Sequence, residues 1–259
     1  MAAALAAALM ANGVVCTPAG ATDSDSDSDA GGLRATPYRP TVSNPADLPV
    51  PKHLEWEAGG LALDEHAGER LLSVPYVLKY AFNENLGVLV GGDSLVSDRT
   101  PGDTSEGWGD TSLVLKIRHP VSKSTALGLE VGAKLPTASS GLGSGHADFS
   151  LNGILSAEVD EFDVDVNLSY TQLGVSDPGT RRGVVGWAIA AAHAVGGPFG
   201  LAGEFSGSEQ KGSPSPAQFL GALSYTLRPT IVLDCGSLLG LNHAAPRYGV
   251  FAGMTVLVP

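Results

Sequence analysis

The chain has few of the residues on which disulfide-stapled and nucleic-acid-binding proteins depend. Its 259 residues include two cysteines, and Cys16 lies in an N-terminal apolar segment that we expect to be removed. Cys235 alone cannot form an intramolecular disulfide, although small secreted domains usually need such staples. Lys plus Arg number 15 against 27 Asp plus Glu, a formal net charge of -12. Phosphate binding needs a basic surface, so nucleic acid is not a predicted partner.

Long apolar runs are also missing. After the N-terminus there is no stretch of about twenty apolar residues, which excludes a bundle of transmembrane helices. A transmembrane β-barrel is not excluded, because its spanning strands are short and only half apolar. The 34 glycines and 17 prolines, with only 16% charged residues, favour many strands and turns over helices.

Motifs that carry chemistry are absent as well. The sequence has no Gly-rich phosphate loop, no metal-spaced His/Cys cluster and no nucleophile elbow, so we predict no catalytic residue, metal or cofactor. His146 precedes Asp148 by two positions and lies near Ser150, a set that a hydrolase could use. A polar rim of loops is the simpler interpretation. His193 shares a phase with Trp187 and could face lipid, but no serine partner is evident.

What the sequence does contain is most visible in a hairpin over residues 108–136. Leu113, Leu115 and Ile117 share one parity, whereas Lys116 and Arg118 share the other, and the alternation resumes after the turn PVSKS. Side chains of a strand point to opposite faces with period two, so one face is apolar and the other charged. A soluble sandwich must cover the apolar face with a second sheet, whereas a membrane barrel turns it to lipid.

Similar alternation continues over about twelve segments, each close to the length of a tilted spanning strand. Long and short connections also alternate: NEN is short, and SDRTPGDTSEGWG, the next connection, is long. Outer-membrane barrels have tight periplasmic turns and long outer loops, whereas a Greek-key sandwich has no reason to alternate them. The segments centre on residues 56–63, 72–82, 87–95, 110–118, 126–135, 148–158, 162–171, 184–194, 199–206, 218–227, 231–239 and 248–258.

Together these patterns predict an all-β fold over residues 51–259. The prediction is a single antiparallel up-and-down transmembrane β-barrel of about 12 strands, with short periplasmic turns and longer outer loops. A soluble β-sandwich remains the alternative fold. Residues 1–21 are predicted to be a signal peptide, with an apolar run and an A-x-A site at Ala19 and Ala21. Residues 22–50 contain DSDSDSD and scattered prolines but no apolar period, so we predict a disordered acidic and Pro-rich leader.

Charged residues in the phase opposite to the apolar face form the candidate site. Charges inside a barrel line a wet path, pair to plug it, or only brace it through cross-strand pairs. About twelve strands lies between the eight that side chains can fill and the sixteen of open porins, so a narrow or plugged channel is expected. The predicted lumen-lining residues are Lys79, Asp93, Asp110, Lys116, Arg118, Glu130, Lys134, Asp148, Glu158, Asp163, Asp165, Glu204, Arg228 and Asp234.

A family resemblance rests on short motifs between residues 54 and 258. GWGD, a strand ending in Lys-x-Arg, a strand ending in LPT, the loop SSGLGSG and the start LEWEAG resemble one group of proteobacterial outer-membrane proteins. They are the putative MetA-pathway of phenol degradation family, many of which are labelled transporters. The resemblance implies an outer-membrane barrel that passes small aromatic or hydrophobic compounds, and it carries no catalytic residues. The chain departs from such barrels at Pro259, where they usually end in an aromatic residue read by the insertion machinery.

The predicted function is therefore a non-enzymatic channel in the outer membrane of a Gram-negative cell. It would allow passive passage of small, aromatic or hydrophobic compounds through the lumen. Its predicted partners are outer-membrane lipid, the barrel-insertion machinery and these solutes. Two alternatives stay open: a structural or adhesive barrel whose lumen is plugged by charges, and a lipid-facing outer-membrane hydrolase.

Overall fold

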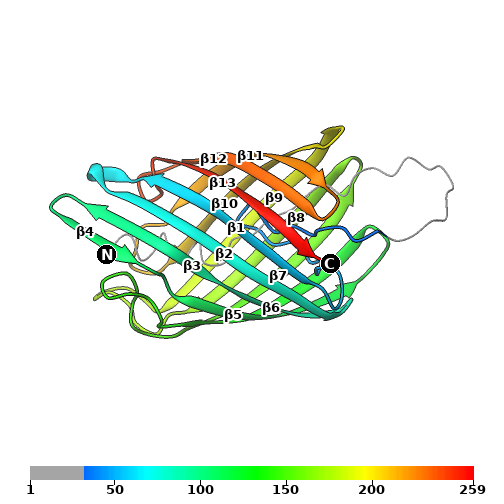
Figure 1. Ribbon diagram of the computed structural model, residues 1–259. Coiled ribbons are helices and arrows are strands. Elements are labelled where there is room, and N and C mark those ends of the chain that lie inside the picture. The colour runs from blue at the N-terminus through cyan, green and yellow to red at the C-terminus, as the bar shows by residue number, and fades with distance from the viewer. Residues whose placement is uncertain (1–31) are drawn as a thin grey trace.

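The computed structural model describes residues 32–259, which form one closed antiparallel β-barrel (Figure 1). Apart from β4, each strand pairs with the next strand along the chain, β3 pairs with β5, and β1 pairs with both β2 and β13, which closes the sheet. The short β4 pairs with β3 beyond the barrel wall, so twelve strands make the barrel. The strands are β1 (Leu54–Asp64), β2 (Arg70–Asn83), β3 (Leu86–Thr100), β4 (Asp103–Gly107), β5 (Thr111–Pro120), β6 (Thr125–Leu135), β7 (Asp148–Val159), β8 (Phe162–Gln172), β9 (Gly183–Gly196), β10 (Phe199–Gln210), β11 (Ala217–Arg228), β12 (Ile231–Gly240) and β13 (Tyr248–Val258).

The apolar parity of the strands faces outward. On β5, Leu113, Leu115 and Ile117 are 40–44% exposed, whereas the intervening Lys116 is fully buried. This is the reverse of a soluble sandwich, where the apolar face would be covered by a second sheet. It is the arrangement of a barrel whose outer band contacts lipid and whose interior is polar. The predicted up-and-down barrel of about 12 strands is therefore confirmed, and the sandwich alternative is wrong.

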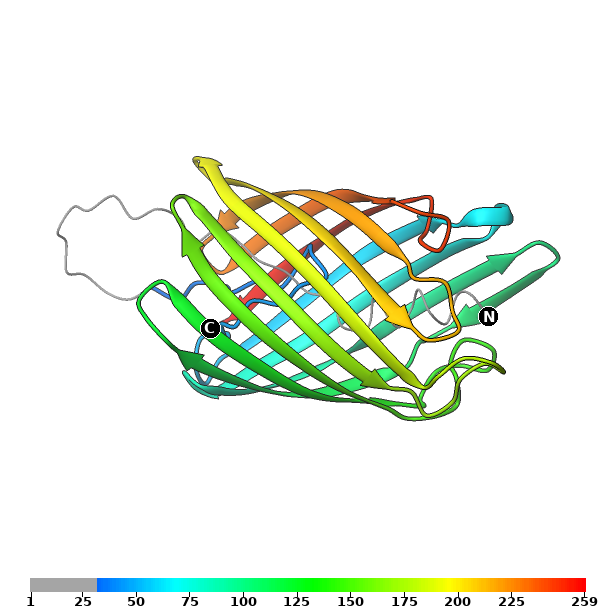
Figure 2. The same cartoon turned by 180° about the vertical axis from the view of Figure 1, so that it is seen from behind.

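The two ends of the barrel differ in the length of their connections. At one end the strands are joined by short turns, such as residues 84–85 and 160–161, and β1 begins and β13 ends there (Figures 1 and 2). Asp160 has a positive φ of 55°, as a two-residue turn requires. Longer loops, such as 136–147 and 173–182, lie at the opposite end. We call these the periplasmic end and the outer end, following the usual asymmetry of such barrels.

Part of the predicted leader lies inside the barrel. Residues 32–53 precede β1, and the blue trace in Figures 1 and 2 enters the lumen near the periplasmic end. Tyr38, Ser43 and Ala46 are fully buried there. We call residues 34–48 the inner segment. The remaining leader residues, 22–31, and the predicted signal peptide, 1–21, lie outside the described residues.

The order of the inner segment corrects the prediction of a disordered leader for residues 32–50. The prediction rested on the lack of an apolar period, which normally leaves too little surface to bury. Inside a polar lumen that requirement does not apply, because the backbone groups of the segment bond to polar side chains of the strands. The only helix among residues 32–259 is a 3-10 turn, His66–Gly68, so none there is long and apolar enough to span a membrane, a finding that does not bear on spanning strands.

Candidate functional site in the barrel lumen

Tyr38 is the central contact between the inner segment and the barrel wall. Two ammonium groups lie close to its ring: Nζ of Lys79 is 3.6 Å and Nζ of Lys116 is 4.0 Å from the ring centroid. Cations are attracted to the face of an aromatic ring, most strongly where water is excluded. The Tyr38 hydroxyl donates to the backbone carbonyl of Asp47 at 2.5 Å, and the backbone N–H of Tyr38 donates to Glu57 Oε1 at 2.5 Å. One residue thus joins β1, β2 and β5 through the lumen.

The charge on Lys79 is balanced by two acids from β1. Its Nζ lies 2.5 Å from Glu55 Oε1 and 2.5 Å from Glu57 Oε1, and all three side chains are buried. The same ammonium donates to the carbonyl of Thr36 at 2.6 Å. A buried charge is costly unless it is paired and hydrogen-bonded, and here both conditions are met. The inner segment therefore supplies one of the acceptors that make the buried lysine tolerable.

Lys116 on β5 is the second buried lysine in contact with Tyr38. It pairs with Glu130 at 3.1 Å and donates to the carbonyl of Pro45 at 2.6 Å. Both Glu130 oxygens also accept from Nδ2 of Asn44 at 2.9 Å, and Asn152 donates to one of them at 3.0 Å. This network holds Asn44 and Pro45 of the inner segment against β5, β6 and β7.

The tip of the inner segment is fixed by two further acids. Oε2 of Glu204 on β10 accepts the N–H groups of Val42 and Ser43 at 2.8 and 2.7 Å. Arg39 forms a two-point pair with Asp234 on β12, at 3.1 and 3.2 Å. Such fork-shaped pairs are stronger and more directional than single contacts. Acids on opposite parts of the wall thus hold the segment from several sides.

The wall is shaped to receive Arg39. A Cβ added at Gly59 or Gly253 would lie 2.5 or 2.4 Å from the Arg39 side chain. Any larger residue at either position would collide with the guanidinium, and glycine in a strand often marks such a close approach. The inner segment and the strand interior are therefore complementary in shape as well as in charge.

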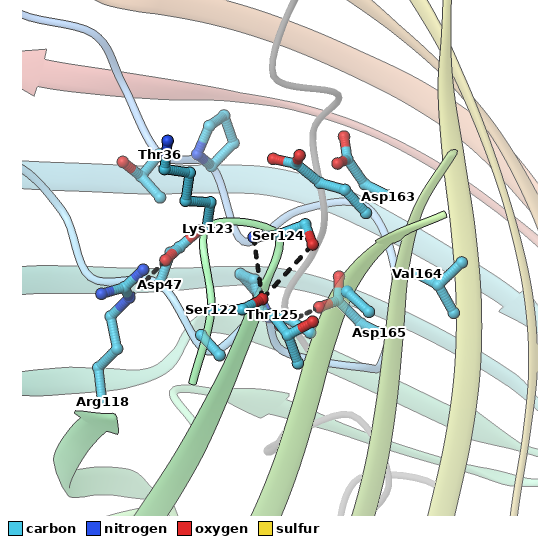
Figure 3. Close-up of a pocket in the computed structure, with 16 residues that line it drawn as sticks. Thr36, Asp47, Arg118, Ser122, Lys123, Ser124, Thr125, Asp163, Val164 and Asp165 are labelled. Atoms are coloured by element: carbon cyan, nitrogen blue, oxygen red, sulfur yellow. Dashed lines mark hydrogen bonds and ion pairs between the residues drawn. The ribbon is translucent and has the colours of Figure 1, made fainter. Parts of the chain in front are cut away.

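A cavity of about 120 Å³ lies beside the inner segment at the periplasmic end (Figure 3). It is bounded by residues of the inner segment and by β5, β6, β7 and β8. Arg118 and Asp47 face each other there with Nε–Oδ1 at 2.6 Å, and Asp165, on β8, accepts from Ser156. A space of this volume with charged walls is large enough for several water molecules. The segment thus narrows the lumen but leaves a charged space beside it.

A second charged group lies at the outer end. Nζ of Lys134 on β6 is 2.8 Å from Asp110 and 3.0 Å from Asp148. Asp110 also accepts the N–H of Ala138 at 2.9 Å, which fastens the loop 136–147 to the barrel mouth. These three charges were predicted individually from parity, and the structure brings them together. We call them the outer triad.

The other predicted lumen-lining residues occupy three kinds of position. Asp93 and Asp163 are partly buried, and Arg118 pairs with Asp47 at the cavity. Glu158 and Arg228 are exposed near the periplasmic ends of β7 and β11, where little of the wall remains to cover them. The buried members are Lys79, Lys116, Glu130, Asp148, Asp165, Glu204 and Asp234.

Sequence reasoning missed several residues of the lumen. Glu55 and Glu57 alternate with the outward Leu54 and Trp56, a signal that was present but obscured by the glycines that follow. Asn152 is buried in the inward phase of β7, and it was missed because only charges were counted. The inner segment itself gave no signal, since its residues have no period of their own.

The residues of the hydrolase alternative are not assembled into a site. Asp148 pairs with Lys134, whereas the His146 ring contacts the Ser144 carbonyl at 2.9 Å. His193 contacts the Glu161 carbonyl at 2.7 Å near the periplasmic rim. Within residues 32–259, no group of three or more His, Cys, Asp or Glu side chains is placed to hold a metal ion.

A closed barrel with a lipid-facing apolar band and a polar, ion-paired lumen is the fold of outer-membrane channels and porins. Several of the solved structures that it resembles are named as channels or porins. The COG4313 outer membrane channel from Pseudomonas putida F1 matches with a TM-score of 0.63, 14% identity and 90% and 100% of the two chains covered. The KdgM porin matches with a TM-score of 0.55, 9% identity and 78% and 98% covered. The CymD monoaromatic hydrocarbon channel matches with a TM-score of 0.51, 13% identity and 80% and 88% covered.

The chain belongs to the family described as "Putative MetA-pathway of phenol degradation", whose model matches residues 38–258. The family resemblance noted in the sequence is therefore confirmed. The matched region begins at Tyr38, so it includes most of the inner segment as well as the barrel. No curated protein matches the chain.

Proposed function

We propose that this protein is a non-enzymatic outer-membrane channel for passive passage of small solutes through its lumen. The observation that carries the proposal is the charged cavity beside the inner segment, inside a barrel whose outer face is apolar. Charged side chains along a lumen replace part of the water shell of a passing solute. The likeness to channels and porins gives the fold, and the charged cavity inside the barrel supports a path for solutes through the lumen.

Small aromatic or hydrophobic compounds are the solutes that we propose. Two observations support them: the family is described by a pathway of phenol degradation, and a barrel of similar fold is a monoaromatic hydrocarbon channel. The inner segment narrows the periplasmic half of the lumen, so large oligomers are poor candidates. Outer-membrane lipid surrounds the apolar band, and the barrel-insertion machinery delivers the chain to the membrane.

The proposal is tested in two steps on the purified, refolded protein. Gel mobility with and without boiling first reports the closed barrel, because closed barrels resist SDS until heated. Reconstituted liposomes then report influx of a small sugar such as arabinose by swelling, with protein-free liposomes as the control. Swelling above the control supports the channel. A heat-modifiable barrel that gives neither swelling nor conductance in planar bilayers contradicts it.

A second candidate function is a closed structural barrel, which the buried pairs of the inner segment favour. In that case the lumen serves only to hold the segment. The triple variant Lys116→Met, Arg118→Met and Lys134→Met distinguishes the two candidates. A closed barrel would conduct only after this neutralisation, whereas a channel conducts before it.

A further inference from the structure

The cavity beside the inner segment reaches from the periplasmic rim into the barrel. Its lining includes Ser122, Lys123 and Glu158, which are exposed at the ends of β5, β6 and β7. The lining also includes Pro45 of the inner segment and Asp165 of β8, both of which are buried. The cavity therefore extends from the solvent-exposed rim into the lumen.

This cavity lies on the side of the barrel formed by β5 to β8. On the side of β1 and β12 the inner segment is bonded directly to the strands, since Glu57 accepts the N–H of Tyr38 and Asp234 pairs with Arg39. At the cavity, open space separates part of the segment from β5 to β8. A second cavity of about 250 Å³, bounded mainly by the loop 136–147, lies at the outer ends of β5 and β6. Both cavities thus lie along the same strands, one at each end of the barrel.

An ion pair connects the inner segment to β5 at the periplasmic cavity. Arg118 and Asp47 face each other there, and both line the cavity (Figure 3). Their side chains are 27% and 54% exposed, whereas those of the nearby pair Lys116 and Glu130 are 0% and 8% exposed. Exposed pairs form and break at little cost, whereas a buried pair cannot lose one partner without strong destabilisation. The Asp47–Arg118 pair can therefore separate while the buried network keeps the segment in place.

We infer that the Asp47–Arg118 pair is the gate at the periplasmic end of a solute path that runs between the inner segment and β5 to β8. The inference rests on the proposed channel function and names the two residues that control passage. When the two side chains are paired they narrow the cavity, and when they separate they widen it. A charge on the wall of a narrow, low-dielectric passage favours ions of the opposite sign. Loss of Arg118 therefore favours cations, and loss of the Asp47 carboxylate favours anions.

The test measures single-channel conductance and reversal potential in planar bilayers under a gradient of KCl. Arg118→Ser and, independently, Asp47→Ser each remove one side chain of the gate. We expect conductance to rise about twofold in both variants, because both widen the same passage. The ratio of K⁺ to Cl⁻ permeability should rise about twofold in Arg118→Ser and fall about twofold in Asp47→Ser. A purely structural role of the pair gives no reason for these opposite shifts.

Arg228→Ser is the matched control for the loss of an arginine at this end of the barrel. Arg228 is an exposed residue at the periplasmic end of β11, and it does not line the cavity. In strand order, β11 is half-way round the barrel from β5. We expect native conductance and a native permeability ratio in this variant. Heat-modifiability verifies that each variant is folded.

The outcomes separate the gate from the channel function. If the native protein conducts but the two folded gate variants show no opposite shifts in the permeability ratio, the gate is overturned and the channel function stands. A shift in Arg228→Ser as large as that in Arg118→Ser also overturns the gate. Absence of conductance in the native, heat-modifiable protein overturns the channel function and this inference with it. Opposite shifts in the two gate variants, with native behaviour in Arg228→Ser, support both.

Discussion

The periplasmic and outer parts of the lumen use the same strands for different purposes. Near the periplasmic end the inward positions are charged, and the inner segment supplies backbone partners for them. Near the outer end, five neighbouring strands carry inward apolar residues that pack into one buried cluster: Leu63, Leu71, Leu220, Leu238 and Phe251. Period-two alternation decides only which side chains point inward. What occupies those positions follows from what lies beside them: the inner segment near the periplasmic end, and other apolar side chains near the outer end.

The largest expected effect comes from removing one partner of the most buried charges. Lys79→Ala leaves Glu55 and Glu57 buried without a cation, and we expect a loss of about 3–5 kcal/mol in the free energy of unfolding. Urea unfolding of the refolded barrel measures it. Lys123→Ala, in an exposed turn, is the control and should be nearly neutral. Equal stability of the two variants would show that the buried cluster does not hold the barrel.

The next largest loss in the free energy of unfolding should come from crowding the Arg39 side chain at Gly253. Gly253→Val places a side chain where the guanidinium now lies, and such overpacking costs about 1–3 kcal/mol. We also expect faster hydrogen exchange at Val42 and Ser43, whose N–H groups are held by Glu204. The matched control is Gly60→Val, because no atom lies within 4 Å of a Cβ at Gly60. Similar exchange rates in both variants would contradict the fit of the segment to the wall.

A smaller effect on the free energy of unfolding is expected from the ionisation of Glu65, near the outer end. Burial raises the pKa of Glu65, in the loop between β1 and β2, and the neighbouring Glu69 and Asp98 raise it further. A raised pKa in the folded state contributes stability that is present below the unfolded pKa and is lost as pH rises through the folded pKa. Glu65→Gln should therefore unfold at higher urea concentration than the native protein at neutral pH but not at acidic pH. An equal difference at both pH values would exclude this origin.

The smallest effect is expected at the outer rim. Arg247 pairs with Asp64 at 3.2 Å, but its side chain is 59% exposed. Exposed pairs contribute about 0–1 kcal/mol, so Arg247→Ala should leave urea unfolding almost unchanged. A loss as large as that of Lys79→Ala would remove the contrast drawn here between the rim and the buried interior.

The barrel could be predicted from the sequence because its rule is local. Leu113, Leu115 and Ile117 need only alternate with polar residues, and the alternation is visible without knowing any partner. The outer triad followed from the same rule. The loop 97–109 was predicted to be simply long, whereas part of it is β4, paired with β3.

The inner segment could not be predicted because its order depends on distant partners. Asn44 is held by Glu130 and Asn167, and no residue near Asn44 in sequence indicates this. Its polar composition is the usual mark of disorder in water. Inside the barrel the same polar groups bond to polar side chains of the strands, so the order of the segment depends on the surrounding barrel and not on the segment's own sequence. The buried apolar cluster near the outer end was also missed, because the inward phase was examined only for charge.

The pairing of Arg39 with Asp234 links two points that are 195 residues apart in the chain. The inner segment is synthesised first, yet β12 is nearly the last strand to be made. The segment therefore cannot reach its final position until the barrel is almost complete, and long-range contacts of this kind slow folding. The final position of an early part of the chain thus depends on one of the last strands to be placed.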